Sequence, residues 1–197
     1  MLLQETDREL VDKIRRGDKA AFCTLVERHA QQLLGMAYSL VGDATDAEDV
    51  VQETLLETMR KLDSFEGRST VGTWMRGILV FKASKLRRQR RRHQALPLGG
   101  DGTTGPMAGD RGDLPGPSVE APPETGRTVA AVDSRVDAAV MLQTLSTEHR
   151  EVVVLRELQQ MSYGEIAEIL KIPIGTVESR LYRARQELKK KFAEYSS

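Results

Sequence analysis

The chain has 197 residues, of which 40% are hydrophobic and 29% charged, and its 29 lysines and arginines equal its 29 aspartates and glutamates. The single cysteine, Cys23, excludes an internal disulfide and a multi-cysteine metal site, and no uninterrupted apolar run is long enough to cross a bilayer. The N-terminal residues do not resemble an export signal, so we expect a soluble cytoplasmic protein with one ordinary domain or two small ones, and no membrane insertion.

Charge is distributed unevenly along the chain. Between Arg76 and His93 there are eight lysines or arginines and no acid, whereas Asp43 to Glu57 carries six acids and no base. The neutral total therefore hides separate basic and acidic surfaces.

The first part of the chain has the periodicity of helices. Apolar residues recur at helical spacing in three segments between residues 10 and 62. The pattern Thr45-Asp-Ala-Glu48 is typical of a capping box and predicts the start of the third helix. Ser69 or Thr70 is a suitable N-cap for a fourth helix from Val71 to about Arg92. With no convincing strand pattern, the N-terminal part is predicted to be a helical bundle.

A linker is predicted at residues 96–133. This stretch holds six of the seven prolines and eight of the sixteen glycines, a composition that sustains neither a helix nor a packed strand. The two parts of the chain that it joins can therefore lie far apart.

The C-terminal part has the element order of a helix-turn-helix. Its third helix opens with a capping box at Ser162 and Glu165, and a tight turn leads to a longer basic helix. The four expected helices lie at 134–145, 147–159, 163–170 and 175–193. The fold class is therefore all-α, with two small helical domains joined by a flexible linker.

The turn before the last helix is specified locally. Pro173 cannot continue the preceding helix, and Ile166 and Val177 fall on faces that meet when the two helices cross. In helix-turn-helix proteins the start of the second helix meets base edges while basic side chains contact phosphates. A basic surface helix with no partner is the alternative, but the Pro-Ile-Gly-Thr-Val turn favours DNA binding. The nominated DNA contacts are Thr176, Glu178, Ser179, Arg180 and Arg183.

The segment FEGRSTVGTWMRGILVFKASKLRRQRRR combines a loop, the aromatic residues Trp74 and Phe81, and a dense basic helix. A protein that holds an unpaired strand needs cations for its phosphates and aromatic rings for its bases. Core packing is the alternative role for Trp74.

Two blocks of the sequence, in this order, resemble the extracytoplasmic-function class of bacterial RNA polymerase sigma factors. They are DATDAEDVVQETLLETMRKLDSFEGRSTVGTWMRGI and SYGEIAEILKIPIGTVESRLYRARQELKK. The resemblance implies a sigma domain two at 6–95 and a sigma domain four at 134–195, on either side of the linker at 96–133.

The resemblance also implies partners and site residues. In the family, the acidic helix docks onto the clamp helices of the largest subunit of core RNA polymerase, and domain four meets the β flap. The loop and basic helix of domain two open and read the promoter −10 element, the loop receiving a flipped base, and domain four reads the −35 element. The implied polymerase contacts are Asp46, Glu48, Asp49, Gln52 and Glu53. The implied −10 contacts are Glu66, Gly67, Arg68, Ser69, Thr70, Trp74, Arg76, Phe81, Lys82, Lys85, Arg87 and Arg88.

The sequence departs from the family at two positions. Many members carry Asn where this chain has Phe81. Either the −10 preference of this protein is unusual, or Phe81 is a core residue. Many carry a base at the position of Glu178, and a carboxylate there accepts a hydrogen bond from cytosine N4 rather than donating to guanine. An atypical −35 motif is expected.

The sequence shows no pattern of catalytic residues. His29, His93 and His149 are scattered, Cys23 is expected to be a small core residue, and no metal or nucleophile constellation forms. We therefore expect no enzyme activity, no cofactor and no metal. An anti-sigma factor is a further partner that the resemblance suggests, and restraint by contact between the two domains is the alternative to it. A stand-alone helix-turn-helix regulator with an N-terminal helical interaction domain is the alternative function.

Overall fold

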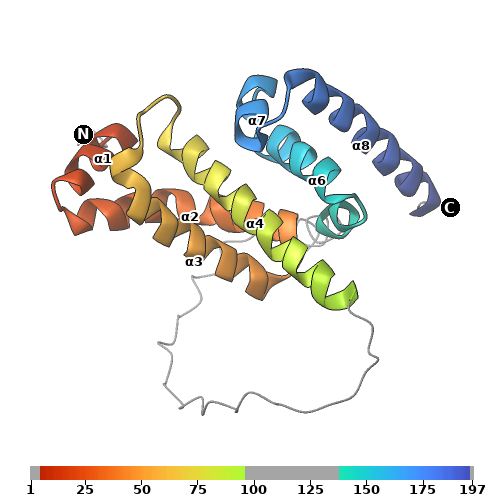
Figure 1. Cartoon of the computed structure of the whole chain (residues 1–197), viewed down its shortest axis with the longest axis horizontal. Helices are drawn as coiled ribbons and strands as arrows, with labels where there is room; N and C mark the ends of the chain where they lie inside the picture. The colour runs from red at the N-terminus through yellow and green to blue at the C-terminus, as the bar shows by residue number, and fades with distance from the viewer. Residues whose placement is uncertain (1–4, 96–137, 196–197) are drawn as a thin grey trace, which may run out of the picture.

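The computed structural model describes residues 5–95 and 138–195, and every regular element in these ranges is a helix. The all-α prediction is confirmed for this part of the chain. Figure 1 shows an N-terminal lobe that ends with α4 and a C-terminal lobe that begins before α6. The predicted linker at 96–133 lies outside the described residues. In chain order the elements are α1 (Asp7–Arg15), α2 (Lys19–Val41), α3 (Ala44–Lys61), the 3-10 turn η1 (Leu62–Ser64), α4 (Val71–Ala95), a helical segment at 138–143, α6 (Thr147–Val153), the π-helical turn η2 (Val154–Leu158), α7 (Tyr163–Leu170) and α8 (Ile174–Tyr195).

Polar side chains cap the helices of the N-terminal lobe. Thr6 forms a capping box with Glu9 at the start of α1, and the Asp18 carboxylate accepts hydrogen bonds from the first amides of α2. The Thr70 hydroxyl accepts a 3.1 Å hydrogen bond from the Thr73 amide, which confirms Thr70 as the cap of α4.

The predicted start of α3 at Thr45 was wrong. Gly42 ends α2 with a left-handed φ of +82°, and Asp43 follows it in an extended conformation. The Asp43 carboxylate then accepts a 2.9 Å hydrogen bond from the Asp46 amide, so α3 begins one residue before Thr45, at Ala44. The cap at Asp43 replaces the capping box that the sequence pattern suggested.

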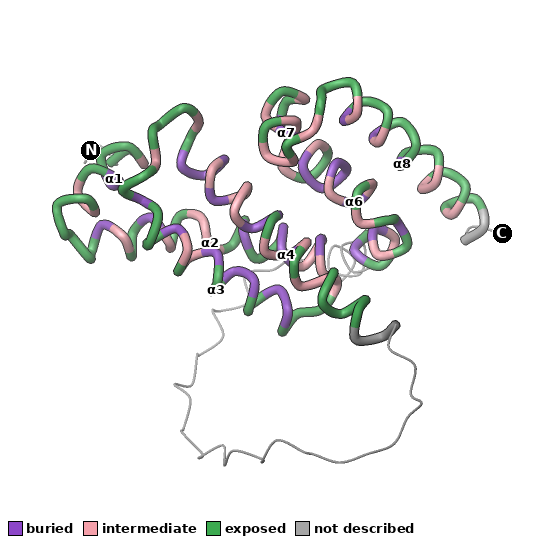
Figure 2. Tube along the Cα trace, viewed as in Figure 1, coloured by how far each residue is buried: buried purple, intermediate pink, exposed green. Residues whose placement is uncertain are grey.

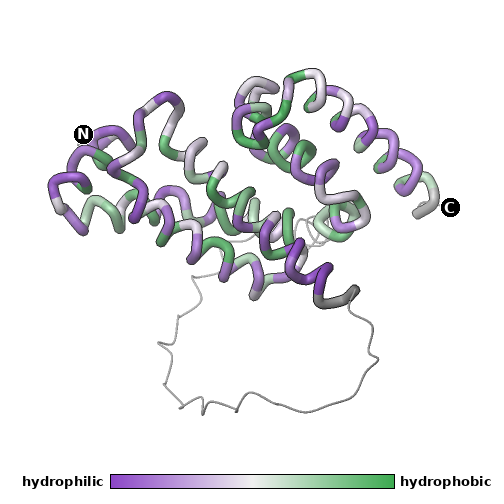
Figure 3. Tube along the Cα trace, viewed as in Figure 1, coloured by the Kyte–Doolittle hydropathy of each residue, from purple (hydrophilic) through white to green (hydrophobic). Residues whose placement is uncertain are grey.

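The core of the N-terminal lobe lies where α2, α3 and α4 pack together. Leu25 and Leu40 of α2 and Met75 and Leu79 of α4 are almost completely buried. Figure 2 shows buried positions facing inward along these helices, and Figure 3 shows hydrophilic residues at the end of α4 and along much of α8. This inward apolar face is the pattern that the helical periodicity predicted.

The C-terminal lobe has the predicted helix-turn-helix. Ser162 and Glu165 form the expected capping box at the start of α7, which ends at Lys171 in the left-handed region. The faces that were expected to meet are buried, with Ile166 of α7 and Val177 of α8 both at 0% exposure.

The helix expected at 147–159 is helical from Thr147 to Leu158, with a π-helical turn over its last five residues, Val154–Leu158. One expectation about local structure was wrong. Cys23, expected in the core, is exposed on α2.

The two lobes pack against each other. α4 contacts α7, and α2 contacts both α6 and η2. Leu40 of α2 and Leu145, Val152 and Val154 of the C-terminal lobe belong to one cluster of buried residues. The described residues therefore share a continuous apolar core.

Candidate nucleic-acid interface

The start of α8 presents the residues nominated for DNA contact on the outside of the C-terminal lobe. Glu178, Ser179 and Arg183 are exposed, and Thr176 is half-buried. Arg180 is also half-buried, because its guanidinium forms a 2.8 Å ion pair with the carboxylate of Glu148 on α6. The structure thus brings the five residues together on one short stretch of helix, and the Arg180 guanidinium is already paired with Glu148.

The loop between η1 and α4 contains the residues proposed to receive a base. Gly67 has a positive φ of +73°, which few other residues adopt, and Glu66 and Arg68 on either side of it form a 2.5 Å ion pair. Ser69 donates a 3.3 Å hydrogen bond to the carbonyl of Thr70. The five residues expected in this loop lie together.

A cavity of about 500 Å³ separates this loop from α1. Its inner wall contains the apolar residues Val11, Phe65 and Val71, and its rim carries charged side chains that include Asp12 and Arg15 of α1. An apolar wall with polar groups at the rim suits a flat, hydrogen-bonding ligand such as a nucleobase.

Arg15 fixes the loop to α1. Its Nη2 atom donates a 3.1 Å hydrogen bond to the carbonyl of Leu62 and another to the carbonyl of Phe65, the residue before the loop. Arg15 and the α1 wall of the cavity could not be predicted from the sequence, because no local pattern signals a contact across 47 to 50 residues.

The two aromatic residues of α4 have different settings. Trp74 is half-buried and packs against Phe65, with ring centroids 5.1 Å apart. Phe81 is 63% exposed, so the alternative of a core role for this side chain is excluded. A phenyl ring at this exposure on a basic helix is available to a partner.

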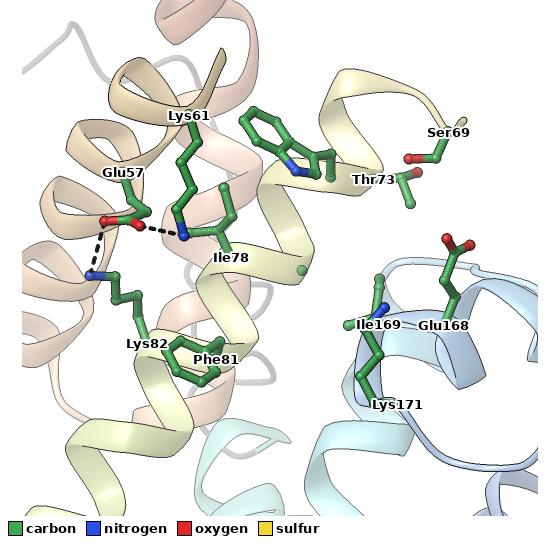
Figure 4. Close-up of a pocket in the computed structure, with 12 residues that line it drawn as sticks. Glu57, Lys61, Ser69, Thr73, Ile78, Phe81, Lys82, Glu168, Ile169 and Lys171 are labelled. Atoms are coloured by element: carbon green, nitrogen blue, oxygen red, sulfur yellow. Dashed lines mark ion pairs between the residues drawn. The ribbon is translucent and has the colours of Figure 1, made fainter. Parts of the chain in front are cut away.

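A second cavity, of about 470 Å³, lies between α3 and α4 on one side and α7 on the other. Figure 4 shows Phe81 and Lys82 of α4 across this cavity from Ile169 and Lys171 of the α7 end. The Glu57 carboxylate lies 3.8 Å from the Lys82 Nζ, so this cation already has an acidic neighbour.

Some cationic side chains of α4 are exposed, and others are hydrogen-bonded within the protein. Lys85 and Arg88 are exposed, whereas Arg76 donates a 3.0 Å hydrogen bond to the Gln32 side chain and Arg87 a 3.2 Å bond to the carbonyl of Leu40. Burial lowers the pKa of Arg76 and of Arg87, although both guanidinium groups keep their charge at neutral pH.

The acidic face of α3 is mostly exposed. Glu48, Asp49, Gln52 and Glu53 lie open to solvent. Asp46 differs, because it is 7% exposed and its carboxylate pairs with Arg90 of α4. Asp46 therefore stabilises the packing of α3 against α4 and contributes little to the exposed acidic face.

In the described ranges no group of three or more His, Cys, Asp or Glu residues could hold a metal ion. Residues 5–95 and 138–195 also contain no helix that is both long and apolar enough to span a membrane.

Comparison with known protein families defines the class of this fold. Residues 25–93 match the family described as Sigma-70 region 2, and residues 135–188 match Sigma-70, region 4. The bundle with its basic helix and the helix-turn-helix are thus the two conserved parts of a sigma-70 type sigma factor.

Similar proteins of known class define the type of sigma factor more closely. The chain is 34% identical to the RNA polymerase sigma-H factor of Pseudomonas aeruginosa over 96% of this chain and 95% of the relative. It is 32% identical to the ECF RNA polymerase sigma-E factor of Escherichia coli K12, with 95% of each chain covered. The chain belongs to the extracytoplasmic-function (ECF) family of RNA polymerase sigma factors.

Solved structures agree with this assignment. CnrH in complex with the cytosolic domain of CnrY aligns with a TM-score of 0.67 and 27% identity, covering 96% of this chain and 99% of CnrH. The sigma factor RpoE of Bartonella quintana, in complex with the anti-sigma factor NepR, aligns with a TM-score of 0.60 and 28% identity, covering 86% and 94% of the two chains.

Proposed function

We propose that this sigma factor binds core RNA polymerase and uses its two lobes on one promoter, the N-terminal lobe to open the −10 element and the C-terminal lobe to read the −35 element. The observation that carries the proposal is the exposed phenyl ring of Phe81, 63% open to solvent on the most basic helix of the chain. Unpaired bases stack on such a ring while neighbouring cations hold the strand.

The loop from Glu66 to Thr70 receives one flipped base in this proposal. The cavity of about 500 Å³ between the loop and α1 supports it, since extruding a base costs a few kcal/mol that stacking and hydrogen bonds in a pocket offset. Phe65 and Trp74, whose rings pack together, border the loop from the side of α4.

The exposed cations Lys85 and Arg88 make the first phosphate contacts on the opened strand. Arg76, Lys82 and Arg87 follow once their present partners are released.

The C-terminal lobe reads the −35 element with the start of α8. The exposed side chains of Glu178, Ser179 and Arg183 support this role, with Thr176 and Arg180 beside them.

The polymerase-binding surface is the acidic face of α3. Its four exposed polar residues, from Glu48 to Glu53, fit a basic face on the clamp helices, and domain four meets the β flap. The proposed domain boundaries are 6–95 and 134–195, with the linker at 96–133. The chain acts in the cytoplasm, where polymerase and promoters are, as a specificity factor without catalytic activity of its own. An anti-sigma factor is its proposed regulator, by analogy with RpoE of Bartonella quintana, whose aligned structure is a complex with the anti-sigma factor NepR.

In vitro transcription tests this function. Purified core polymerase and a genomic fragment library are incubated with and without the protein, and the 5′ ends of transcripts are mapped. Discrete starts that depend on the protein, with −10 and −35 motifs upstream, are expected. Phe81→Ala should reduce these transcripts about tenfold, because loss of one base–aromatic stack costs about 1–3 kcal/mol.

The control is Phe192→Ala, which removes an equally exposed phenyl ring from the far end of α8. Tight duplex binding by a chain that neither binds core polymerase nor starts transcripts would instead indicate a stand-alone regulator.

A further inference from the structure

The carbonyl oxygen of Leu40, near the end of α2, accepts hydrogen bonds from two arginines. Arg150 of α6, which is 1% exposed, donates to it from Nη1 at 2.8 Å, and Arg87 of α4 donates from Nη1 at 3.2 Å. Burial, with the like charges of Arg87 and Arg91, lowers the pKa of Arg150 to about 9. The one acid that opposes this effect among the described residues is Glu151, so positive charge is in excess between α4 and α6.

A cavity of about 410 Å³ lies beside this excess charge, between α4, the start of α6 and the end of α7 (Figure 1). The cations that line it are Arg88, Arg91 and Lys171. The large apolar side chains that line it include Phe81, Ile169 and Leu170. Sites for small molecules commonly have volumes of about 300–1,000 Å³ and combine apolar walls with a few polar groups. The cavity therefore has the size and the lining of a ligand site.

The three cations at this cavity lack acidic partners. None of them forms an ion pair within residues 5–95 and 138–195, and Arg88 donates a 3.4 Å hydrogen bond to a carbonyl of its own helix. On the same helix, by contrast, Lys82 and Arg90 pair with acids of α3. Unpaired cations are available to a ligand, and guanidinium groups match the oxygens of phosphate.

Two acids also line the cavity, but each has a partner of its own. Glu148 pairs with Arg180 of α8 at 2.8 Å, and Glu151 accepts a hydrogen bond from Ser84 of α4. Glu151 also offsets part of the charge of the two guanidinium groups at Leu40. The three cations of the cavity thus keep a positive charge that an anionic ligand can neutralise.

We propose that this cavity binds a nucleoside di- or triphosphate, with the phosphates on the three cations and the base against the apolar side chains. Several unpaired cations favour a ligand with several negative charges. The ring of Phe81, 63% exposed, and the side chain of Ile169 offer a surface on which a planar base can pack. A nucleoside polyphosphate has both parts in one molecule.

A nucleotide in this cavity competes with the promoter strand, because Phe81 and Arg88 are proposed contacts of both. The concentration of the nucleotide then determines how readily α4 takes up an opened strand. This competition rests on the proposed function of α4, whereas binding of the nucleotide does not.

Isothermal titration calorimetry of the full chain tests the site, in magnesium-free buffer with ATP, adenosine and inorganic triphosphate as probes. ATP should bind at least tenfold more tightly than either of the other two probes, since each of them lacks one of the two recognised parts. Arg91→Ala and Lys171→Ala should each weaken ATP binding at least tenfold, because each removes a charge-assisted contact. The matched controls are Arg92→Ala on α4 and Lys190→Ala on α8, two exposed cations that do not line the cavity.

Two results would overturn the site as proposed. Absence of ATP binding, or equal affinities of the cavity variants and the controls, would show that the cations do not form a nucleotide site. Inorganic triphosphate that binds as tightly as ATP would exclude recognition of the base.

Competition is measured without polymerase, by fluorescence anisotropy of a labelled single-stranded oligonucleotide that carries the mapped −10 sequence. ATP should displace it from the wild type, and at least tenfold more ATP should be needed with the double variant Arg91→Ala, Lys171→Ala. Equal displacement from both proteins would contradict competition at this cavity. An oligonucleotide that does not bind the wild type, although ATP does, would count instead against the proposed function of α4.

Discussion

At the scale of single residues, the cationic side chains of α4 and α8, the two helices proposed to face DNA, divide into those that are open to solvent and those that already have a partner. Lys85, Arg88 and Arg183 are exposed, whereas Arg87 is bonded to the carbonyl of Leu40 and Arg180 is paired with Glu148. An engaged cation loses its present bond when it binds a phosphate, so its net contribution to DNA affinity is smaller than that of an exposed one.

Glu178 is the residue for which the proposed function makes the most specific prediction about base reading. An exposed carboxylate at the start of a recognition helix accepts from the amino group of cytosine and disfavours guanine. Glu178→Ala should therefore weaken the preference for cytosine at one −35 position about tenfold, measured by transcription from a promoter library randomised there. Gln186→Ala, further along α8, should leave the preference unchanged. An unaltered base preference in both variants would contradict the role.

Glu151 of α6, whose carboxylate accepts a hydrogen bond from Ser84 of α4, gives the packing of the two lobes a pH dependence. Burial raises the pKa of its carboxyl group, against the opposing effects of the Ser84 hydrogen bond and of Arg87 and Arg180, while Glu148 adds to the rise. A folded-state pKa above the unfolded value near 4.5 means that ionisation of Glu151 costs stability at neutral pH, and that this cost is relieved as pH falls through the folded-state pKa.

Glu151→Gln removes that cost at all pH values. It should raise the free energy of unfolding at pH 7 relative to wild type, and the difference between the two proteins should shrink at pH 5, as measured by urea denaturation. Glu157→Gln, at an exposed ion pair, is the control and should show no such difference. A destabilised Glu151→Gln at pH 7 would contradict the assignment of a buried, costly charge.

At the scale of elements, α1 supports the loop from Glu66 to Thr70 that we propose receives a base of the −10 element. The loop contains a glycine at positive φ and an exposed ion pair, and neither anchors it to the bundle. Arg15 supplies the anchor through its hydrogen bonds to the carbonyls of Leu62 and Phe65. The position of the loop therefore depends on a helix that sequence analysis had not connected with DNA.

Removing this anchor should loosen the loop without unfolding the bundle. Arg15→Met is expected to reduce promoter opening about tenfold, because a hydrogen bond from a charged donor contributes about 1.5–3 kcal/mol. The measurement is the rate of core-dependent transcription from a mapped promoter. The control is Arg16→Met, since the one side-chain hydrogen bond of Arg16 within residues 5–95 and 138–195 goes to the Asp12 carbonyl of α1. Equal rates for both variants would exclude a positioning role for Arg15.

The helix boundaries illustrate what local sequence can predict. The capping box at Ser162 and Glu165 and the cap at Thr70 were predicted because each involves residues only three apart. The start of α3 was missed because two overlapping patterns competed, and Gly42 favoured the cap at Asp43. The π-helical turn at Val154–Leu158 has no signal in the periodicity.

At the scale of the whole molecule, the two helical modules and their candidate DNA-facing residues could be predicted from the sequence, but the contact between the modules could not. The bond from Arg150 to Leu40 joins residues 110 positions apart, and a buried arginine with only carbonyl acceptors resembles a surface arginine in sequence. Cys23 was misplaced for a related reason, since a small residue fits either side of a helix. Such features depend on the packing of distant segments.

The proposed division of labour between the lobes rests on one helix in each. The N-terminal lobe carries a basic, partly aromatic helix that we propose holds an opened strand, and the C-terminal lobe carries the helix that we propose reads duplex DNA.

Mapping of unpaired bases on a promoter tests the central claim most directly. Core polymerase and this protein are bound to a promoter found by transcript mapping, and unpaired thymines are detected with permanganate. Reactive thymines should appear at and downstream of the −10 element with the wild type, and Phe81→Ala should lose them while keeping protection of the −35 element. Reactivity that is independent of the protein, or unchanged by Phe81→Ala, would contradict the account of strand opening by α4.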